Sequence, residues 1–426
     1  GRPGVVDSRG WTSSPLFEKT GEHTASVRNL VMKPGEGGAS VETIQLTFSS
    51  LTGGVFAYTR QRLEPEHRGG AVLETASGNF SLIRSSDVNI PAAAHAATFF
   101  PRHADAYSDG RSSIFWGLQA SDAGQVFTRG LGPNQCDQEG VREPVITRIG
   151  DQYLLHYDGA GVRGWLACSA TSTDLVNWVR QGPILDFGPA GSRDAGAACS
   201  PWIIEDRGTW HMFYLGSRTQ TPPPERVPES PYPTLKAKAV SAFGPWTKQP
   251  EVNVIALNSA FPSPDSSPGA IVRGPTGWRQ YFSIADYNPP PAAPQRTLML
   301  GQTQNLDATW SFGSDPLLPW NEQVENSSIF YDDTSGHWFL FTNHVGLDVT
   351  GAEYTDAVWV YWSRDPERFD PRNKAVVMDA STSTWAHGAI GMPTAVKAKG
   401  KLALLYDGVP GAGTTHLPRD IGLAWI

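Results

Sequence analysis

The chain has 426 residues and a formal net charge of −8, from 34 Lys and Arg residues against 42 Asp and Glu residues. Its basic residues form no run, which argues against nucleic acid as a partner, because neutralising phosphates needs clustered Lys and Arg. No apolar stretch reaches the roughly 18 residues of a membrane-spanning helix, so no membrane partner is expected.

The N-terminal segment, residues 1–130, is expected to be rich in β-strands and to contain no helix of ordinary length. Alternating apolar and polar residues between Gly-rich turns predict half-buried antiparallel strands. These strands are Glu42–Ser50, Gly53–Gln61, Phe80–Ser86, Ser112–Ser121 and Gly124–Leu131. A linker of small residues, Pro91–Ala97, separates the first three from the last two.

From about residue 131 onward, the sequence repeats a three-strand unit with a period of about 60 residues. The first copy has strands at Ile146–Ile149, Gln152–Gly159 and Gly164–Thr171. The first two strands recur as pairs at Ser200–Ser217, Ser267–Asp286, Ser327–His344 and Met392–Gly408. This period suits four-stranded blades, so residues 131–426 are predicted to form a five-bladed β-propeller. The last copy ends within its third strand, so a strand from before Glu143 is expected to close the ring.

Acidic residues and a histidine stand just before the inner strand of each predicted blade. When the repeats are aligned on Pro144, Pro201, Pro268, Ser328 and Pro393, these positions carry Glu143, Asp194, Asp265, Glu325 and His387. Inner strands begin around one end of a propeller channel, so these side chains are expected to converge. Structural alternatives remain open: Asp265 can cap a turn, Asp194 can pair with Arg193, and His387 can be a packed histidine.

Several segments resemble the five-bladed β-propeller glycoside hydrolases of family 43 and its relatives in families 32, 62 and 117. They are REPVITRIGDQYLLHYDG, SATSTDLVNW, SAFGPW and ENSSIFYDDTSGHWFLFTNH, and the resemblance runs from about Pro133 to Ile426. The sequence differs from the family pattern at two motifs. The usual Asp-Pro-Ser is Glu143-Pro144-Val145 here, and the usual Glu-Gly-Pro is Glu325-Asn326-Ser327. The chain is therefore expected to be a divergent member.

The resemblance implies a glycosidase that uses paired carboxylates, one to protonate the leaving oxygen and one to activate water or attack the sugar. It places Glu325 as the general acid and Glu143 or Asp194 as the base. The residues expected to line the sugar site are Arg142, Asp265, His344, Trp385 and His387. No cofactor is required, although relatives can hold a divalent cation such as calcium on the propeller axis, which His387 would contact here.

The expected substrate is a plant or algal oligosaccharide or polysaccharide, attacked from its end. Two alternatives stay open, a carbohydrate-binding propeller without catalysis and a glycoside phosphorylase. A phosphorylase would need a basic anion pocket, for which Arg142, Arg193 and Arg419 are the candidates.

The three cysteines, Cys136, Cys168 and Cys199, are an odd number at spacings that predict neither a disulfide framework nor a CxxC metal site. The start Gly-Arg-Pro has no signal-like apolar segment, which fits a processed secreted chain or a cytoplasmic one. Charged residues are only 18% of the chain, which resembles secreted bacterial carbohydrate enzymes. A secreted or periplasmic location is therefore expected.

Overall fold

A computed structural model describes residues 18–21, 24–31, 40–50, 53–63, 69–81, 120–256, 265–286, 295–333, 336–348 and 352–426. The chain divides into two compact units, Gly1–Phe99 and Phe100–Ile426. Among the described residues, regular structure is almost entirely β-strand, with short 3₁₀ turns η2 (Pro133–Gln135) and η3 (Trp320–Glu322). The all-β prediction is therefore confirmed. No helix in this part of the chain has the length and apolar character needed to cross a membrane.

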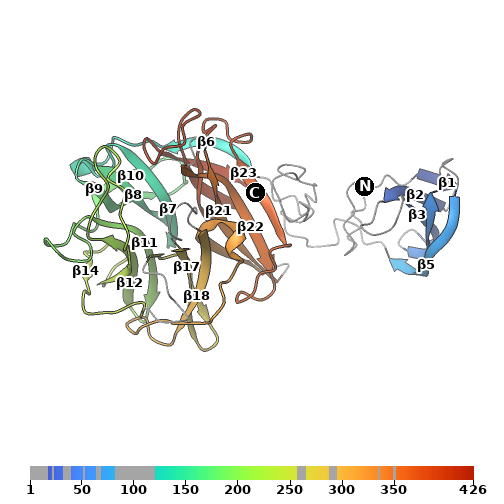
Figure 1. Cartoon of the computed structure of the whole chain (residues 1–426), viewed down its shortest axis with the longest axis horizontal. Helices are drawn as coiled ribbons and strands as arrows, with labels where there is room; N and C mark the ends of the chain where they lie inside the picture. The colour runs from blue at the N-terminus through green and yellow to red at the C-terminus, as the bar shows by residue number, and fades with distance from the viewer. Residues whose placement is uncertain are drawn as a thin grey trace. The chain divides into compact units, whose positions relative to one another are not determined.

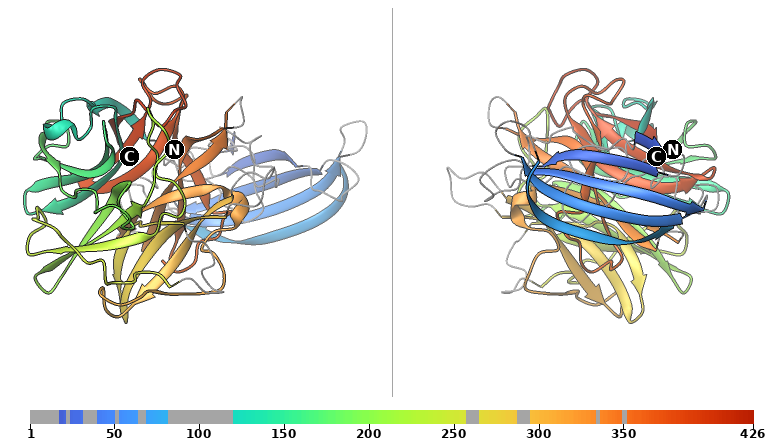
Figure 2. Two further views of the ribbon diagram at one scale, coloured as in Figure 1. Left: turned by 60° about the vertical axis from the view of Figure 1, so that its left-hand side comes forward. Right: turned by 90° about the vertical axis from the view of Figure 1, so that its right-hand side faces the viewer.

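The smaller unit contains one antiparallel sheet whose strands follow chain order, drawn in blue in Figure 2. Its strands are β1 (Glu18–Gly21), β2 (Thr24–Val31), β3 (Ser40–Ser50), β4 (Gly53–Leu63) and β5 (Gly69–Ser81). The strands predicted at residues 42–50 and 53–61 lie within β3 and β4, and residues 80–81 of the third end β5. Residues 82–86, the linker at 91–97 and residues 112–119 lie outside the described residues.

The larger unit is a succession of antiparallel meanders arranged side by side (Figure 1). The first two meanders are β7 (Gly140–Ile149), β8 (Gln152–Gly161), β9 (Gly164–Ser172) and β10 (Val179–Pro183), then β11 (Ala197–Asp206), β12 (Thr209–Ser217), β13 (Thr234–Ala239) and β14 (Thr247–Lys248). The parallel pair Leu166 and Ala198 joins them into one eight-stranded sheet.

The next two sheets have the same strand order. One contains β15 (Ser266–Ser267), β16 (Ile271–Gly274), β17 (Gly277–Asp286), β18 (Gln295–Thr303) and β19 (Ser311–Phe312). The other contains β20 (Val324–Asp332), β21 (His337–Leu347), β22 (Glu353–Ser363) and β23 (Lys374–Asp379). Hydrogen bonding assigns these strands to sheets that do not join into one ring, so the count of five blades stays a prediction.

The last sheet combines strands from the two ends of the larger unit. Its order is β24 (Ile390–Ala398), β25 (Lys401–Gly408), β26 (Asp420–Trp425) and β6 (Ser121–Phe127). Strand β6 runs antiparallel to β26, with Phe127 opposite Ile421 and Ser121 opposite Trp425. This pairing confirms the expectation that a strand from before Glu143 completes the last sheet. Most of β6 lies in the second of the two candidate segments, residues 124–131.

Apolar residues between neighbouring sheets form the core. One cluster brings together the buried side chains of Phe127 on β6, Leu155 on β8, Met212 on β12 and Leu423 on β26. Side chains at alternate positions of a strand point to opposite faces, so a strand between two other sheets carries apolar residues on both faces. This accounts for the nearly continuous apolar runs in the repeat, such as the buried residues 153–160 of β8.

Four inner strands carry a β-bulge at the same place. The register shifts lie between Arg142 and Val145, Cys199 and Trp202, Glu325 and Ser328, and Gly391 and Thr394. In each, the first bulged residue has a left-handed backbone: φ is 51° for Glu143, 50° for Ser200, 54° for Asn326 and 51° for Met392. Glu143 therefore corresponds to Asn326. The alignment of Ser328 with Pro144 was one residue too late, because Ser327 replaces the proline that marks the bulge in the other three strands.

The cysteine prediction was wrong. Cys136 and Cys168 are joined by a disulfide with Cα atoms 6.6 Å apart, while Cys199 is free and buried. The disulfide links the end of η2 to β9. Only the fold brings these segments together, since the two cysteines are 32 residues apart in sequence.

Candidate active site

A pocket of about 170 Å³ lies where the inner strands meet. The bulge residues Glu143, Asn326 and Met392 line it, together with Ser267, the last residue of β15, which directly precedes Pro268. Four sheets thus contribute to the pocket from corresponding positions, and of the five residues expected to converge, Glu143 and Glu325 line it. The connecting loops add Val227, Pro228, Tyr232 and His416 to its wall.

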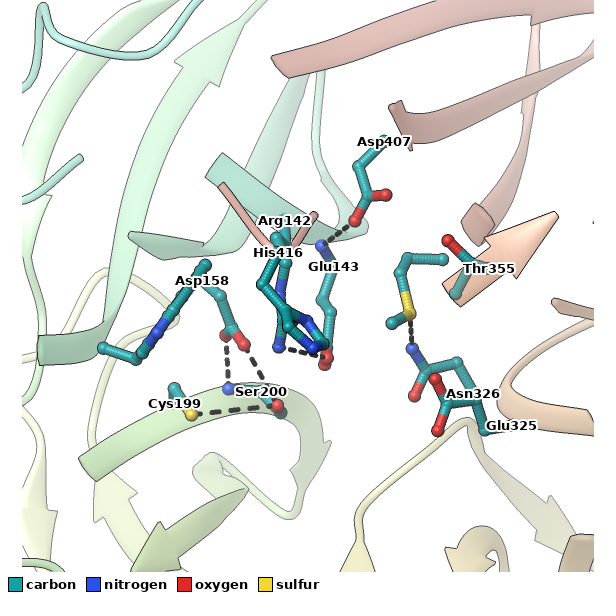
Figure 3. Close-up of polar contacts among 12 residues, drawn as sticks. Arg142, Glu143, Asp158, Cys199, Ser200, Glu325, Asn326, Thr355, Asp407 and His416 are labelled. Carbon is teal, nitrogen blue, oxygen red and sulfur yellow. Dashed lines mark hydrogen bonds and ion pairs between the residues drawn. The ribbon is translucent and has the colours of Figure 1, made fainter. Parts of the chain in front are cut away.

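Glu143 has a mostly buried side chain, which is 14% exposed, and faces the pocket (Figure 3). Arg142 places its Nη2 atom 3.4 Å from Oε1 of Glu143. Burial raises the pKa of Glu143, and this effect outweighs the opposing effects of Arg142 and a hydrogen bond from Ser200; the negative charges of Glu325 and Asp407 add to it. Glu143 is thus a carboxyl group that tends to keep its proton.

Glu325 lines the same pocket and has a closer cationic partner than Glu143. Its Oε2 atom lies 2.9 Å from Nη1 of Arg296, and Asn343 places its Nδ2 atom 3.5 Å from Oε1. Arg296 also binds Glu353 through Nη2, at 2.9 Å. Arg296 thus forms ion pairs with two carboxylates. Three carboxyl groups therefore line the pocket: Glu143, whose anion burial disfavours, and Glu325 and Glu353, which share Arg296.

Arg142 is positioned by its neighbours. Its guanidinium lies over the ring of Trp165, 4.3 Å from the ring centroid, and its Nη1 atom is 2.9 Å from Nδ1 of His416. Arginine can only donate, so Nδ1 of His416 accepts. Burial, with the charges of Arg142, Arg419 and Arg296, holds the pKa of His416 well below its usual range. His416 is therefore neutral, with its remaining proton on Nε2.

The sequence matches no protein-family model. It also matches no curated protein.

The structure does have similar solved structures. One, described as a complex of BT0996 with RGII, has a TM-score of 0.55 and 13% identity, and the match covers 72% of the present protein and 92% of the similar one. A second, described as "Glycoside hydrolase", gives the same values. This protein has the fold of the propeller glycoside hydrolases. The resemblance seen in the sequence is thus confirmed at the level of the fold. A family 117 glycoside hydrolase from Zobellia galactanivorans is also similar, with a TM-score of 0.49 and 14% identity over 72% of the present protein and 90% of that hydrolase.

Within this hydrolase fold, the structure does not bring Asp194 to the pocket. Its carboxylate accepts hydrogen bonds from Tyr214 Oη at 2.9 Å, Ser192 Oγ at 2.8 Å and Lys248 Nζ at 2.6 Å. These partners outweigh burial and lower the pKa of Asp194. The arrangement recurs where Tyr157 donates to Asp137 at 3.2 Å and Tyr406 to Asp122 at 2.7 Å. Asp194 thus belongs to a repeated structural pair between a strand tyrosine and an aspartate.

Replacing Asp194 with Asn should lower the free energy of unfolding by about 1–3 kcal/mol, because Lys248 loses its charged partner and Tyr214 loses an acceptor of full strength. Turnover should stay at the wild-type value. Chemical denaturation and steady-state kinetics measure the two effects. A loss of turnover at unchanged stability would instead return Asp194 to the catalytic set.

Two further predicted sugar-site residues lie outside the pocket lining. Asp265 is buried and accepts hydrogen bonds from the Tyr232 amide at 2.9 Å and from Ser230 Oγ at 2.8 Å, so it holds the loop that precedes β13. This is the turn-capping alternative left open by the sequence. His344 stacks on Trp359 with ring centroids 4.2 Å apart, and its Nδ1 atom is 2.7 Å from Asp356.

Trp385 and His387 lie before β24, also outside the pocket lining. Trp385 stacks on Tyr406 and donates Nε1–H to its hydroxyl at 2.7 Å, which is a packing role in the last sheet. His387 is exposed, with Nδ1 3.4 Å from the carbonyl oxygen of Ala380. Among the described residues, no group of three or more His, Cys, Asp or Glu side chains could hold a metal. The metal contact of His387 stays a prediction.

Sequence reasoning missed several groups at the site, namely Asp158, Arg296, Glu353, Asp407 and His416. Two of them carried a signal: Tyr157-Asp158-Gly159 on β8 and Tyr406-Asp407-Gly408 on β25 are the same tripeptide at equivalent places. The others have no counterpart in the remaining repeats. They come from strand ends and loops, so their position follows only from the fold.

Proposed function

We propose that this protein is a glycoside hydrolase in which Glu143 and Glu325 act together on a glycosidic bond. The observation that carries the proposal is that, of the three carboxyl groups on one small pocket, Glu143 has a raised pKa and Glu325 forms a close ion pair with Arg296. Glycoside hydrolysis needs one protonated and one ionised carboxyl group. The fold shared with glycoside hydrolases supports the same reading.

The roles are the reverse of those implied by the resemblance. Glu143 is the general acid, because burial and the nearby carboxylates favour its protonated form. Glu325 is the base or nucleophile, because it forms an ion pair with Arg296 at 2.9 Å. Arg142 orients Glu143, and the Nε2–H of neutral His416 offers a hydrogen bond to a sugar hydroxyl.

The substrate is an oligosaccharide or polysaccharide of plant or algal type, cut from its end. A volume of about 170 Å³ is small beside the roughly 300–1,000 Å³ of common ligand pockets, and favours one terminal sugar residue over a polysaccharide passing through. The similar structure described as an RGII complex supports a carbohydrate as the ligand. The meanders of the larger unit would then be five blades around this pocket.

A phosphorylase finds less support. Arg142 and Arg419 are engaged with Glu143 and Asp407, and Arg193 donates to the carbonyl oxygen of Pro250 at 2.7 Å. Of the two remaining readings, hydrolysis and binding without turnover, the environment of Glu143 favours hydrolysis. The disulfide between Cys136 and Cys168 supports a secreted or periplasmic location, since disulfides persist in oxidising compartments.

Aryl furanosides and pyranosides, together with plant and algal oligosaccharides, should be screened with and without phosphate. We expect phosphate-independent release of one terminal sugar from at least one of them. Strict dependence on phosphate would replace the hydrolase by a phosphorylase. Sugar binding, measured by calorimetry, without turnover of any substrate would replace it by a binding propeller.

A further inference from the structure

Three bulge amides of the larger unit are held by side chains of a neighbouring meander. The amide of Asn326 donates to Ser283 Oγ on β17 at 2.7 Å, and the amide of Ser200 donates to Asp158 on β8. The amide of Glu143 donates to Asp407 Oδ2 on β25 at 3.0 Å (Figure 3). In each case the acceptor lies on the second strand of the preceding meander. For Glu143 that meander is the last one, and the two residues are 264 positions apart in sequence.

Asp407 is fully buried and has a second partner on its other oxygen. Its Oδ1 atom lies 2.7 Å from Nη1 of Arg419, which also donates to Thr355 Oγ1 on β22 at 3.0 Å. One carboxylate thus joins the amide of the proposed acid on β7 to the loop before β26 and, through Arg419, to β22. Neither side chain can move independently, since Asp407 is 0% and Arg419 1% exposed.

The backbone at Glu143 needs such a partner. A residue with a Cβ atom at φ 51° is strained, and a following proline further restricts its conformation. Strained conformations of this kind cost about 1–3 kcal/mol and persist only where the surrounding structure holds them. Pro144 offers no N–H of its own, so the Glu143 amide is the donor by which the bulge can be fixed.

We propose that Asp407 is a positioning residue for Glu143: its carboxylate holds the bulge amide so that the Glu143 side chain faces Glu325 across the pocket. The catalytic part of this inference rests on the proposed function. Asp407 does not line the pocket, so it acts through Glu143 and not on the sugar. A displacement of about 1 Å at a reacting group can lower a rate by about a hundredfold.

The charges around Glu143 give the proposal an electrostatic signature. The charge of Glu143 interacts with the charges of four neighbours, namely Arg142, Glu325, Asp407 and Asp158. Of these, Asp407 carries a negative charge that raises the pKa of Glu143. Replacing Asp407 with Asn removes that charge and leaves Arg419 without its anion, and both changes lower the pKa of Glu143. The alkaline limb of the activity profile, where the acid loses its proton, should then move to lower pH.

The test compares Asp407→Asn and Asp407→Ala with Ser283→Ala, which removes the corresponding contact at Asn326. Turnover of the aryl glycoside that the wild-type protein hydrolyses is measured across pH, and thermal unfolding checks that each variant is folded. Asp407→Ala should lower kcat about 10–100-fold with KM within about threefold. Asp407→Asn keeps an acceptor for the amide, so it should lose less kcat but shift the alkaline limb. Ser283→Ala should leave that limb in place. Folded Asp407 variants with wild-type kcat and limb would overturn the proposal.

Hydrogen exchange at residues 140–149 measures the contact without activity. Asp407→Ala should speed exchange of this segment several-fold, whereas Ser283→Ala should leave it unchanged. Unchanged exchange in Asp407→Ala would overturn the positioning role. Faster exchange in a protein whose wild type hydrolyses no glycoside would keep the contact, and would instead contradict the proposed function.

Discussion

Replacing Glu143 with Gln is expected to lower kcat by about 10²–10⁴-fold, the usual contribution of a positioned general acid. Gln keeps the shape of the side chain and cannot release a proton to the leaving oxygen. Glu325→Gln is the matched variant, and it should lower kcat by a similar factor, because its amide can neither activate water nor attack the sugar. Steady-state kinetics on the substrate found in the screen measures both.

A second substrate separates the two roles. An aryl glycoside with a very acidic phenol as leaving group needs little protonation, so Glu143→Gln should recover much of its activity on it, whereas Glu325→Gln should not. The opposite pattern would restore the assignment implied by the resemblance, with Glu325 as the acid. Full activity of both variants would remove the two residues from the mechanism.

The pH dependence of stability tests the environment of Glu143 independently of turnover. Its folded pKa is raised above the ordinary value of 4.5. The stability contributed by its protonated form is therefore fully present below about 4.5 and is lost as the pH rises through the folded pKa. Gln does not ionise, so Glu143→Gln does not lose this stability. The free energy of unfolding of the variant, minus that of the wild type, should therefore rise from pH 4 to pH 8. A constant difference in urea denaturation across this range would contradict the raised pKa.

Replacing Lys374 with Met is expected to lower the free energy of unfolding by about 3–5 kcal/mol, the usual cost of leaving a buried charge without its partner. Lys374 Nζ lies 2.7 Å from Glu322 Oε2, with the two side chains 4% and 1% exposed. The same oxygen accepts a hydrogen bond from Tyr361 at 2.6 Å. The pair of Lys374 and Glu322 thus holds η3 against β23, in the sheet formed by β20, β21, β22 and β23.

The double variant Glu322→Gln with Lys374→Met is the control for this experiment. It removes the charge that the single variant leaves buried, so it should recover a large part of the lost stability. Urea denaturation midpoints give both values. A single variant within about 0.5 kcal/mol of wild type would show that water or another group compensates Glu322.

Strand periodicity and the repeat predicted much of the fold. The runs Gln152–Gly159 and Met392–Gly408 are strands, and the need for a partner beside the last strand correctly indicated β6. These features are local or repeat along the chain, so they are visible in one sequence. Glu143 and Glu325 were predicted to lie near each other in the same way. A residue in or beside a bulge that recurs in several repeats has an equivalent position in each of them.

The remaining site residues depend on contacts between repeats. Asp194 precedes an inner strand, yet a tyrosine on the neighbouring strand and Lys248 hold it away from the pocket. Arg296 and His416 reach the pocket from single positions with no counterpart elsewhere in the sequence. No spacing rule indicates such residues. Ser327 in place of proline shifted one alignment by a residue, which is enough to confuse a pocket residue with its neighbour.

The pairing of β6 with β26 has a consequence for the order in which the protein forms during synthesis. Among the described strands of the larger unit, β6 is made first and its partner β26 last, and Arg129 and Asp420 are in contact across 291 residues. Until β26 is available, β6 and β25 each have an unpaired edge, and such edges bind other strands readily. Asp407 also reaches Glu143 only when the ends have met. The pocket is therefore complete only after β26 has been made and has paired with β6.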